Sequence, residues 1–182
     1  MFLNQLSLMD SNNFSDICGL GEREGRVYSR LVKQRHFYFA HGIGRSGDIN
    51  EIQPKATGSS IVNRLTNELL FDLVKTSGLT FAKDCFLMPM ATGMTLTFCM
   101  LSMRQMKPNA KYVLMPRIDQ KSCIKSILTA GYAPVIIENV LVGDELQTNV
   151  KAIEEKVREL KPENILCIFS TTSCFAPRAC DK

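Results

Sequence analysis

The sequence is poor in the residues that build metal centres. It has only two histidines, and none of its seven cysteines stands in a CxxC pair or in a spacing typical of zinc ligands. Several of the cysteines lie in apolar runs, where a cysteine behaves as a small hydrophobic residue. We therefore expect no metal site, reduced thiols and a cytoplasmic location.

Targeting segments and long apolar runs are also missing. Residues 1–11 lack the basic start and the long apolar stretch of a signal peptide. The most apolar stretch, Met88–Met106, is interrupted by Pro89 and Gly93 and falls short of the length of a bilayer span. We expect neither a signal peptide nor association with a membrane.

The composition is that of an ordinary globular protein. Hydrophobic residues make up 45% and charged residues 22% of the 182 residues, which suits one domain or a large piece of a bigger one. The net charge of +4 permits an anionic partner such as RNA or phosphate, but no dense run of Lys and Arg demands one. A mildly basic enzyme surface explains the charge equally well.

Apolar runs of strand length alternate with helical patterns in the second part of the chain. The runs are Cys85–Met88, Tyr112–Met115, Pro134–Val140 and Asn164–Phe169. The helical patterns between them are Met94–Met106, Gln120–Thr129 and Leu146–Leu160. This alternation predicts an α/β fold of βαβ units with a mostly parallel sheet, in which ligands bind at the carboxyl ends of the strands.

The first part of the chain predicts helices and loops. Glu22–Phe39 has roughly helical spacing. A long amphipathic helix is expected to follow, capped by Ser59 or Ser60 and stopped at Gly78.

We divide the chain into an N-terminal helical segment with a binding loop, 1–57, and an α/β domain, 58–182. No helical pattern follows the last apolar run to cover it. We therefore expect a truncated domain, with a small complete domain and a loose tail as the alternative.

A glycine-rich segment, His41–Asp48, continues to Gln53 and has the composition of an anion-binding loop. Glycines let the backbone approach a ligand closely, and Arg45 can direct two hydrogen bonds to one phosphate. Ser46 and Gln53 add neutral donors. A glycine-rich surface turn with an incidental arginine explains the same residues, and composition alone does not separate the two interpretations.

A second candidate segment, Pro89–Met94, lies between an expected strand and an expected helix. Backbone N–H groups at a helix start attract an anion, and Thr92 can cap the helix as well as bind that anion. An ordinary helix cap is an equally good interpretation. Three further polar segments could also line a binding site, but each has an equally simple structural explanation. Gly21–Arg26 could be a salt-bridged helix start, Asp119–Ser122 a helix cap, and Ser170–Cys174 a loop whose hydroxyls bond the backbone.

Taken together, these segments resemble the O-phosphoseryl-tRNA(Sec) selenium transferase family. The resemblance rests on HGIGRSGD at 41–48 and PRIDQKSC at 116–123, and it runs over almost the whole chain. It implies the N-terminal part of the large domain of a fold type I enzyme that depends on pyridoxal phosphate. It further implies a homotetramer that converts O-phosphoseryl-tRNA(Sec) to selenocysteinyl-tRNA(Sec), with selenophosphate as donor, in selenocysteine biosynthesis.

The resemblance also implies roles for individual residues. The family's phosphate-binding loop matches Gly44–Pro54. The residues expected to hold the substrate are Arg45, Ser46 and Gln53, at its phosphoryl group, and Lys121. The residues expected to bind pyridoxal 5'-phosphate are Arg23, Thr92, Gly93 and Gln120.

The family's chain is much longer than this one. Its Schiff-base lysine lies well beyond the position equivalent to Arg178, and the arginine that contacts the tRNA end and the C-terminal domain are absent too. We therefore expect an incomplete, inactive chain without catalytic residues. The alternative is a non-catalytic short isoform that acts in RNA binding or oligomerisation. A related lyase or desulfurase is disfavoured by Arg45 and Gln53, since those enzymes hold no phosphorylated serine.

Overall fold

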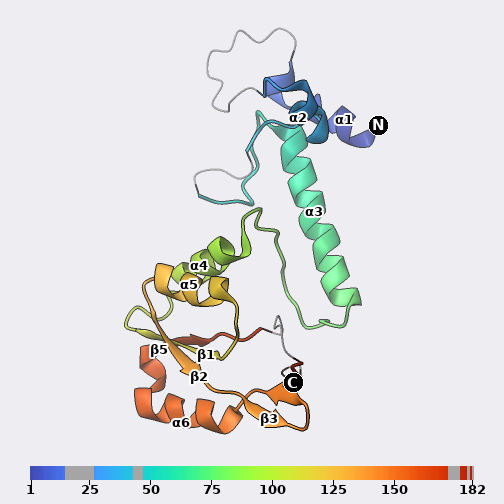
Figure 1. Cartoon of the computed structure of the whole chain (residues 1–182). Coiled ribbons are helices and arrows are strands. Elements are labelled where there is room, and N and C mark those ends of the chain that lie inside the picture. The colour runs from blue at the N-terminus through green and yellow to red at the C-terminus, as the bar shows by residue number, and fades with distance from the viewer. Residues whose placement is uncertain (15–26, 43–46, 172–176, 180, 182) are drawn as a thin grey trace. The chain divides into compact units, whose positions relative to one another are not determined.

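The computed structural model of the chain describes residues 1–14, 27–42, 47–171, 177–179 and 181 (Figure 1). The chain forms two compact units, Met1–Met88 and Pro89–Lys182. Their boundary lies later than the division at 57/58 expected from the sequence, because the helix that begins at residue 57 is bonded to residues near the N-terminus.

The first unit is helical. Its elements are α1 (Phe2–Ser7), the short 3-10 helix η1 (Ser11–Asn13), α2 (Arg30–Arg35) and α3 (Thr57–Thr76). Within the described residues, the helical pattern expected over Glu22–Phe39 corresponds to α2 alone. This helix is short because Ser29 caps its start by accepting the N–H of Val32. Phe37 and Tyr38 then take positive φ angles of 51° and 68°, which end it.

A buried carboxyl group holds the start of α3. The expectation that Ser59 or Ser60 caps this helix is wrong, since the N-cap is Ala56 and both serines lie in the first turn. The acceptor is Asp10, which is fully buried and takes hydrogen bonds from the N–H of Ser59, at 2.9 Å, and from its hydroxyl. An acidic group suits the positive end of a helix. Sequence rules missed it because it comes from 49 residues away.

Gly58, next to this cap, allows α1 and α3 to touch. A Cβ atom at Gly58 would lie 1.8 Å from the carbonyl oxygen of Leu6. No side chain fits there without moving a backbone segment. The expected stop at Gly78 is confirmed, because this residue follows α3 with a φ of 109°.

The second unit is an α/β layer structure. Its helices are α4 (Thr92–Met103), α5 (Lys121–Thr129), α6 (Val150–Leu160) and the 3-10 helix η2 (Pro162–Asn164). Its strands are β1 (Tyr112–Pro116), β2 (Ala133–Ile137), β3 (Val140–Val142), β4 (Glu145–Gln147) and β5 (Ile165–Ile168). Strands β2, β1 and β5 lie side by side in this order, and both pairs are parallel. The expected α/β fold with a mostly parallel sheet is confirmed.

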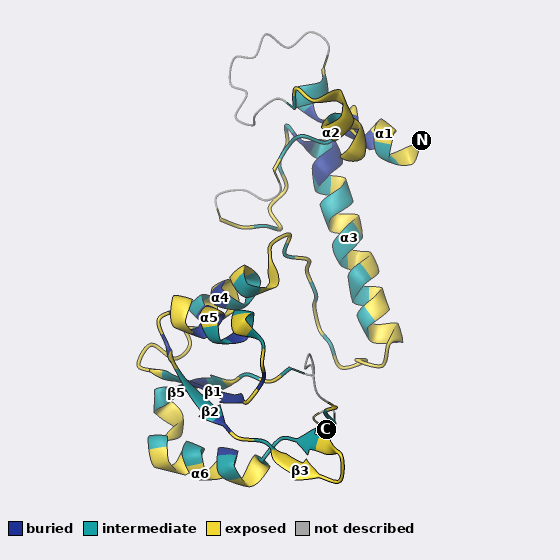
Figure 2. Ribbon diagram, in the orientation of Figure 1, coloured by how far each residue is buried: buried dark blue, intermediate teal, exposed yellow. Residues whose placement is uncertain are grey.

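Helices cover both faces of this sheet, with α4 and α5 on one face and α6 on the other (Figure 1). Val113 and Met115 of β1 pack in the cluster with α4 and α5, whereas Leu114 between them packs with α6. A strand buried on both faces needs a continuous apolar run, and β1 has one. Figure 2 shows the buried residues gathered on β1 and on the helix faces turned toward the sheet.

Two expected elements differ from the structure. Cys85–Met88 is not a strand, and the N–H of Leu87 is bonded to a side chain of α3 instead of a neighbouring strand. The helix expected from Leu146 begins only at Val150, because β3 and β4 form an antiparallel hairpin before it. Gly143, with a φ of 62°, makes the hairpin turn.

Among the described residues, no helix combines the length and the apolar character that crossing a bilayer requires.

We predict that Gly58→Ala destabilises the first unit by about 1–3 kcal/mol, the usual cost of overpacking, because the new methyl group collides with Leu6. Gly93→Ala is the matched control, since a Cβ there meets its nearest neighbour at an ordinary 3.7 Å. Urea unfolding followed by circular dichroism measures both. Equal effects of the two substitutions would contradict the close approach of α1 and α3.

Candidate functional site

After residues 43–46, which lie outside the described ranges, the glycine-rich segment continues at Gly47, whose φ of 90° is a left-handed conformation that favours glycine. The carboxyl oxygen Oδ1 of Asp48 accepts the backbone N–H of Asn50 at 2.9 Å and so forms an Asx turn. Arg45 and Ser46, both expected to hold a phosphoryl group, lie outside the described residues.

Side chains on one face of α3 hold this loop. Ser60 Oγ accepts the backbone N–H of Gln53 at 3.0 Å, so the structure fixes the backbone of one expected substrate residue. One turn later, Asn63 Nδ2 donates to the carbonyl oxygen of Ile49 at 3.1 Å. Ser and Asn are weak helix formers, and here their polar groups attach the loop to a long helix. This suits a binding loop that needs a rigid support.

Asn67, on the next turn, bonds two separate segments. Its Nδ2 donates to Oδ1 of Asn50 at 3.0 Å, and its Oδ1 accepts the N–H of Leu87 at 2.8 Å. We call Ser60, Asn63 and Asn67 the polar face of α3. Sequence reasoning missed it because it considered only the apolar stripe of this helix.

A cavity of about 600 Å³ lies between the loop and α3. The charged residues of its lining are Glu51, Arg64 and Glu68, and the last two form an ion pair at 2.5 Å. The described lining therefore has no excess of positive charge. An anion in this cavity would require a further cation.

In the second unit, α4 and α5 start without a side-chain cap. The expectation that Thr92 caps α4 is wrong, because Ala91 is the N-cap and Thr92 is already the first helical residue. At α5 the N-cap is Gln120, whose side chain caps no N–H of the helix, and Lys121 is the first helical residue. By contrast, Asn149 caps α6 by accepting the N–H of Ala152 at 3.1 Å.

The two uncapped starts lie side by side. A Cβ at Gly93 would meet Cβ of Ser122, in the first turn of α5, at 3.7 Å. Thr97 Oγ1 lies 2.8 Å from the carbonyl oxygen of Gly93 and 3.4 Å from that of Ser126 on α5, and it donates to both. The structure therefore brings together four of the expected site residues, namely Thr92, Gly93, Gln120 and Lys121.

This pair of helix starts has the chemistry of an anion site. The first N–H groups of a helix have no acceptor within the helix, and the helix dipole adds positive potential there. Lys121 is exposed at the same end and contributes a full charge. A phosphate group is the natural ligand of such an arrangement.

An ion pair flanks the site at the carboxyl edge of the sheet. The guanidinium of Arg117 donates to both carboxyl oxygens of Glu138 at 2.5–2.8 Å. These hydrogen bonds raise the pKa of Arg117 and lower the pKa of Glu138. Both side chains are more than half exposed, so the pair contributes little to stability.

Two other expected residues are not part of the described α4–α5 site. Arg23 lies outside the described residues, and Gln53 belongs to the first unit. Within the described ranges, no three His, Cys, Asp or Glu residues gather to hold a metal. The thiols described are free, and burial raises the pKa of Cys123 and Cys167, which makes them poor nucleophiles.

Comparison with known proteins gives a consistent result. The sequence profile of the family O-phosphoseryl-tRNA(Sec) selenium transferase, SepSecS, matches residues 9–182. A protein of that name from Dictyostelium discoideum is 59% identical over 185 residues, which cover all of this chain and 39% of the relative. One from Methanocaldococcus jannaschii is 38% identical over 182 residues, which cover all of this chain and 41% of the relative.

A solved structure is also similar. The crystal structure of an archaeal O-phosphoseryl-tRNA(Sec) selenium transferase matches with a TM-score of 0.85 and 35% identity, over 98% of this chain and 41% of that chain. The chain thus spans about two fifths of the length of these relatives. The likeness confirms the expected fold class.

We predict that Asn67→Leu speeds hydrogen exchange of the Leu87 amide about fivefold, because it removes a hydrogen bond with a net contribution of about 1 kcal/mol. Asn67→Asp is the control, since it keeps an acceptor for that amide. Nuclear magnetic resonance measures both rates. Wild-type exchange at Leu87 in Asn67→Leu would show that the polar face of α3 does not hold this segment.

Proposed function

This chain belongs to the O-phosphoseryl-tRNA(Sec) selenium transferase family, and we propose that it forms part of an enzyme that converts O-phosphoseryl-tRNA(Sec) to selenocysteinyl-tRNA(Sec). The match over residues 9–182 carries this proposal. The proposed selenium donor is selenophosphate. The proposed partners are tRNA(Sec) and further copies of the chain in a homotetramer.

The proposed cofactor is pyridoxal 5'-phosphate, and the paired starts of α4 and α5 fit its phosphate group. Thr92 and Gly93 would hold that phosphate. Because Gly93 has no side chain, its backbone N–H stays accessible to a ligand. Gln120 would lie near the ring and Lys121 near the substrate, with Arg23 as a further contact. When bound, this cofactor withdraws electrons from the substrate and so eases the loss of its phosphate.

The proposed role of the glycine-rich loop is to hold the phosphoryl group of the substrate. Phosphate leaves as a dianion, and an arginine fork with neutral donors stabilises the charge that grows on it. Arg45 would supply the fork, with Ser46 and Gln53 as donors. The hydrogen bond from the backbone N–H of Gln53 to Ser60 Oγ supports this role, because it fixes the backbone that carries the Gln53 side chain.

The proposed location is the cytoplasm. The described cysteines Cys85, Cys99, Cys123 and Cys167 carry free thiols, which a reducing compartment maintains.

We predict that Arg45→Ala in the full-length protein slows phosphate release from O-phosphoseryl-tRNA(Sec) by a factor of about 100 or more, while binding of pyridoxal phosphate is retained. Arg35→Ala is the control, because Arg35 is an exposed arginine on α2 in the same unit. A phosphate-release assay and cofactor absorbance provide the two readouts. Undiminished turnover by Arg45→Ala would refute the role of this residue.

We also predict that the 182-residue chain by itself forms no specific covalent link to pyridoxal phosphate, since the family's Schiff-base lysine is expected to lie well beyond the position equivalent to Arg178, and Lys182 does not match it. The measurement is borohydride reduction after addition of the cofactor, followed by peptide mapping. Stoichiometric labelling of one lysine would contradict this prediction.

A further inference from the structure

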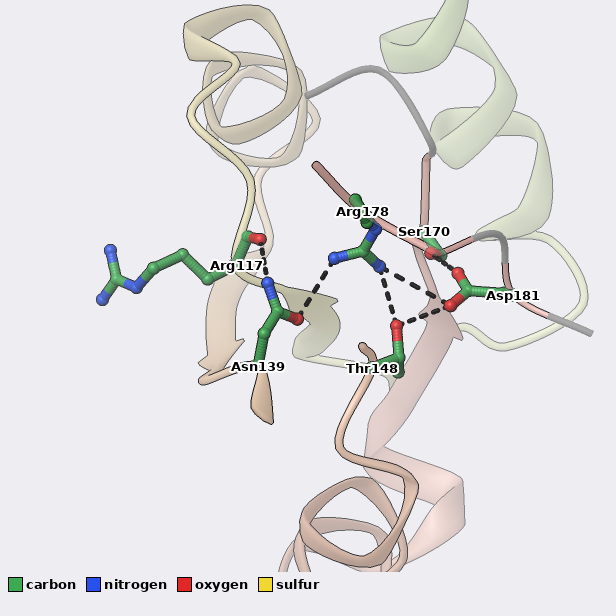
Figure 3. A network of polar contacts seen from close by, with 6 residues as sticks. All are labelled: Arg117, Asn139, Thr148, Ser170, Arg178 and Asp181. Atoms are coloured by element: carbon green, nitrogen blue, oxygen red, sulfur yellow. Dashed lines mark hydrogen bonds and ion pairs between the residues drawn. The ribbon is translucent and has the colours of Figure 1, made fainter. Parts of the chain in front are cut away.

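Arg178 carries a buried charge at the carboxyl edge of the sheet. Its side chain is 1% exposed, although arginine is rarely buried unless it is paired. One terminal nitrogen donates to Oδ1 of Asn139 at 3.2 Å and the other to Oγ1 of Thr148 at 2.7 Å (Figure 3). The carboxylate of Asp181 lies 3.6 Å away. Among the described residues, Nε of Arg178 finds no acceptor, so the two terminal nitrogens hold the side chain.

These two hydrogen bonds reach both ends of one hairpin. Asn139 directly precedes β3, and Thr148 directly follows β4. A hairpin of two strands is marginally stable by itself, and β3 is exposed along its whole length. The guanidinium of Arg178 therefore joins the two ends of the β3–β4 hairpin, which needs contacts from outside to be stable.

The backbone next to Arg178 strengthens this attachment. The N–H of Leu146, on β4, donates to the carbonyl oxygen of Pro177 at 3.0 Å. The N–H of Ala179 donates back to the carbonyl oxygen of Leu146 at 3.0 Å. Segment 177–179 thus pairs with the hairpin on both sides of the buried side chain.

The same contacts extend to the ends of β1 and β5. Asn139 Nδ2 donates to the carbonyl oxygen of Arg117, which directly follows β1, at 2.8 Å. Thr148 Oγ1 donates to Oδ1 of Asp181 at 2.6 Å, and the hydroxyl of Ser170, just after β5, donates to the other oxygen of that carboxylate. Figure 3 shows these side chains converging on Arg178, while the guanidinium of Arg117 points away.

The place of this network in the fold gives it a functional meaning. The connection from β1 leads to β2 on one side of the sheet, and β5 returns on the other side. In α/β sheets, ligands bind at the carboxyl ends of strands where the order of connection changes direction in this way. The segment that leaves β1 there carries Gln120 and Lys121, three and four residues after Arg117.

We propose that Arg178 is a positioning residue: it holds the segments that follow β1, β2 and β5 in one network and so sets the position of Gln120 and Lys121. The importance of this positioning for cofactor and substrate binding rests on the proposed function. The hydrogen-bond network itself does not depend on that function.

The chemistry explains why arginine occupies this position. Its planar fork directs two nitrogens to two acceptors at once, and a lysine ammonium has no such fixed geometry. Hydrogen bonds from Ser170 and Thr148, with the charge of Arg178, hold the pKa of Asp181 below its usual value. The carboxylate therefore stays charged opposite the buried guanidinium at neutral pH.

The test is hydrogen exchange by nuclear magnetic resonance on the 182-residue chain. Arg178→Met is expected to speed exchange of the Leu146 and Ala179 amides at least tenfold and to shift the resonances of Gln120 and Lys121. The amides of Val113–Met115, in the centre of the sheet, are expected to keep their rates. Arg178→Lys should not restore protection, because one ammonium group cannot replace the fork.

Two further variants make the test specific. Arg117→Met is the matched control, since this arginine lies at the same edge but pairs outward with Glu138, and it should leave Leu146 and Ala179 unchanged. Thr148→Val removes one arm of the network with little change of shape. It should speed exchange of the same two amides, and it keeps the test valid if Arg178→Met does not fold.

Each outcome decides the proposal. Wild-type exchange of Leu146 and Ala179 in both Arg178→Met and Thr148→Val would overturn the network. Faster exchange with unmoved Gln120 and Lys121 resonances would overturn the positioning role. A uniform rise throughout the second unit would reduce Arg178 to a general contribution to stability. None of these measurements uses cofactor or tRNA. A failure of the proposed function can therefore be distinguished from a failure of the positioning role of Arg178.

Discussion

The starts of α4 and α5, which lie side by side without a side-chain cap, are the constraint on which the candidate site of the second unit depends. Both helices begin without a side-chain cap, although α3 and α6 in the same chain have one. The two starts lie close together, since a Cβ at Gly93 would meet Cβ of Ser122 at 3.7 Å. Because uncapped N–H groups favour an acceptor, these two starts suit the phosphate group proposed to bind there.

The segments around the candidate sites are held by long-range polar contacts. In the first unit, the polar face of α3 holds the glycine-rich loop. In the second, Arg178 joins the chain after three parallel strands. Loops that bind charged groups need fixed donors, since donors that must reorganise stabilise a growing charge less well. These contacts are therefore the physical link between the fold and the proposed chemistry.

Much of the fold could be predicted from local pattern. The parallel strands and the stop at Gly78 follow from apolar periodicity and from the permissive backbone of glycine. The cap from Asp10 could not be predicted, because it joins residues far apart in the chain. The β3–β4 hairpin had a local signal, Gly143-Asp144 between Val and Leu residues, that the helical interpretation overlooked.

The site was predicted unevenly. Thr92, Gly93, Gln120 and Lys121 were singled out, and the structure brings them to one end of the α4–α5 pair. Arg178 was not, because nothing in the sequence distinguishes a buried arginine from a surface one. The roles of all these site residues stay predictions, and Arg23, Arg45 and Ser46 lie outside the described part of the chain.

A phosphate titration of the 182-residue chain, followed through backbone amide resonances, tests the central claim most directly. The account predicts saturable shifts at Thr92, Gly93, Lys121 and Ser122, and none at Val150 and Lys151, where Asn149 already caps the helix. Absence of saturable shifts at the first four residues, or equal shifts at the capped start of α6, would contradict it.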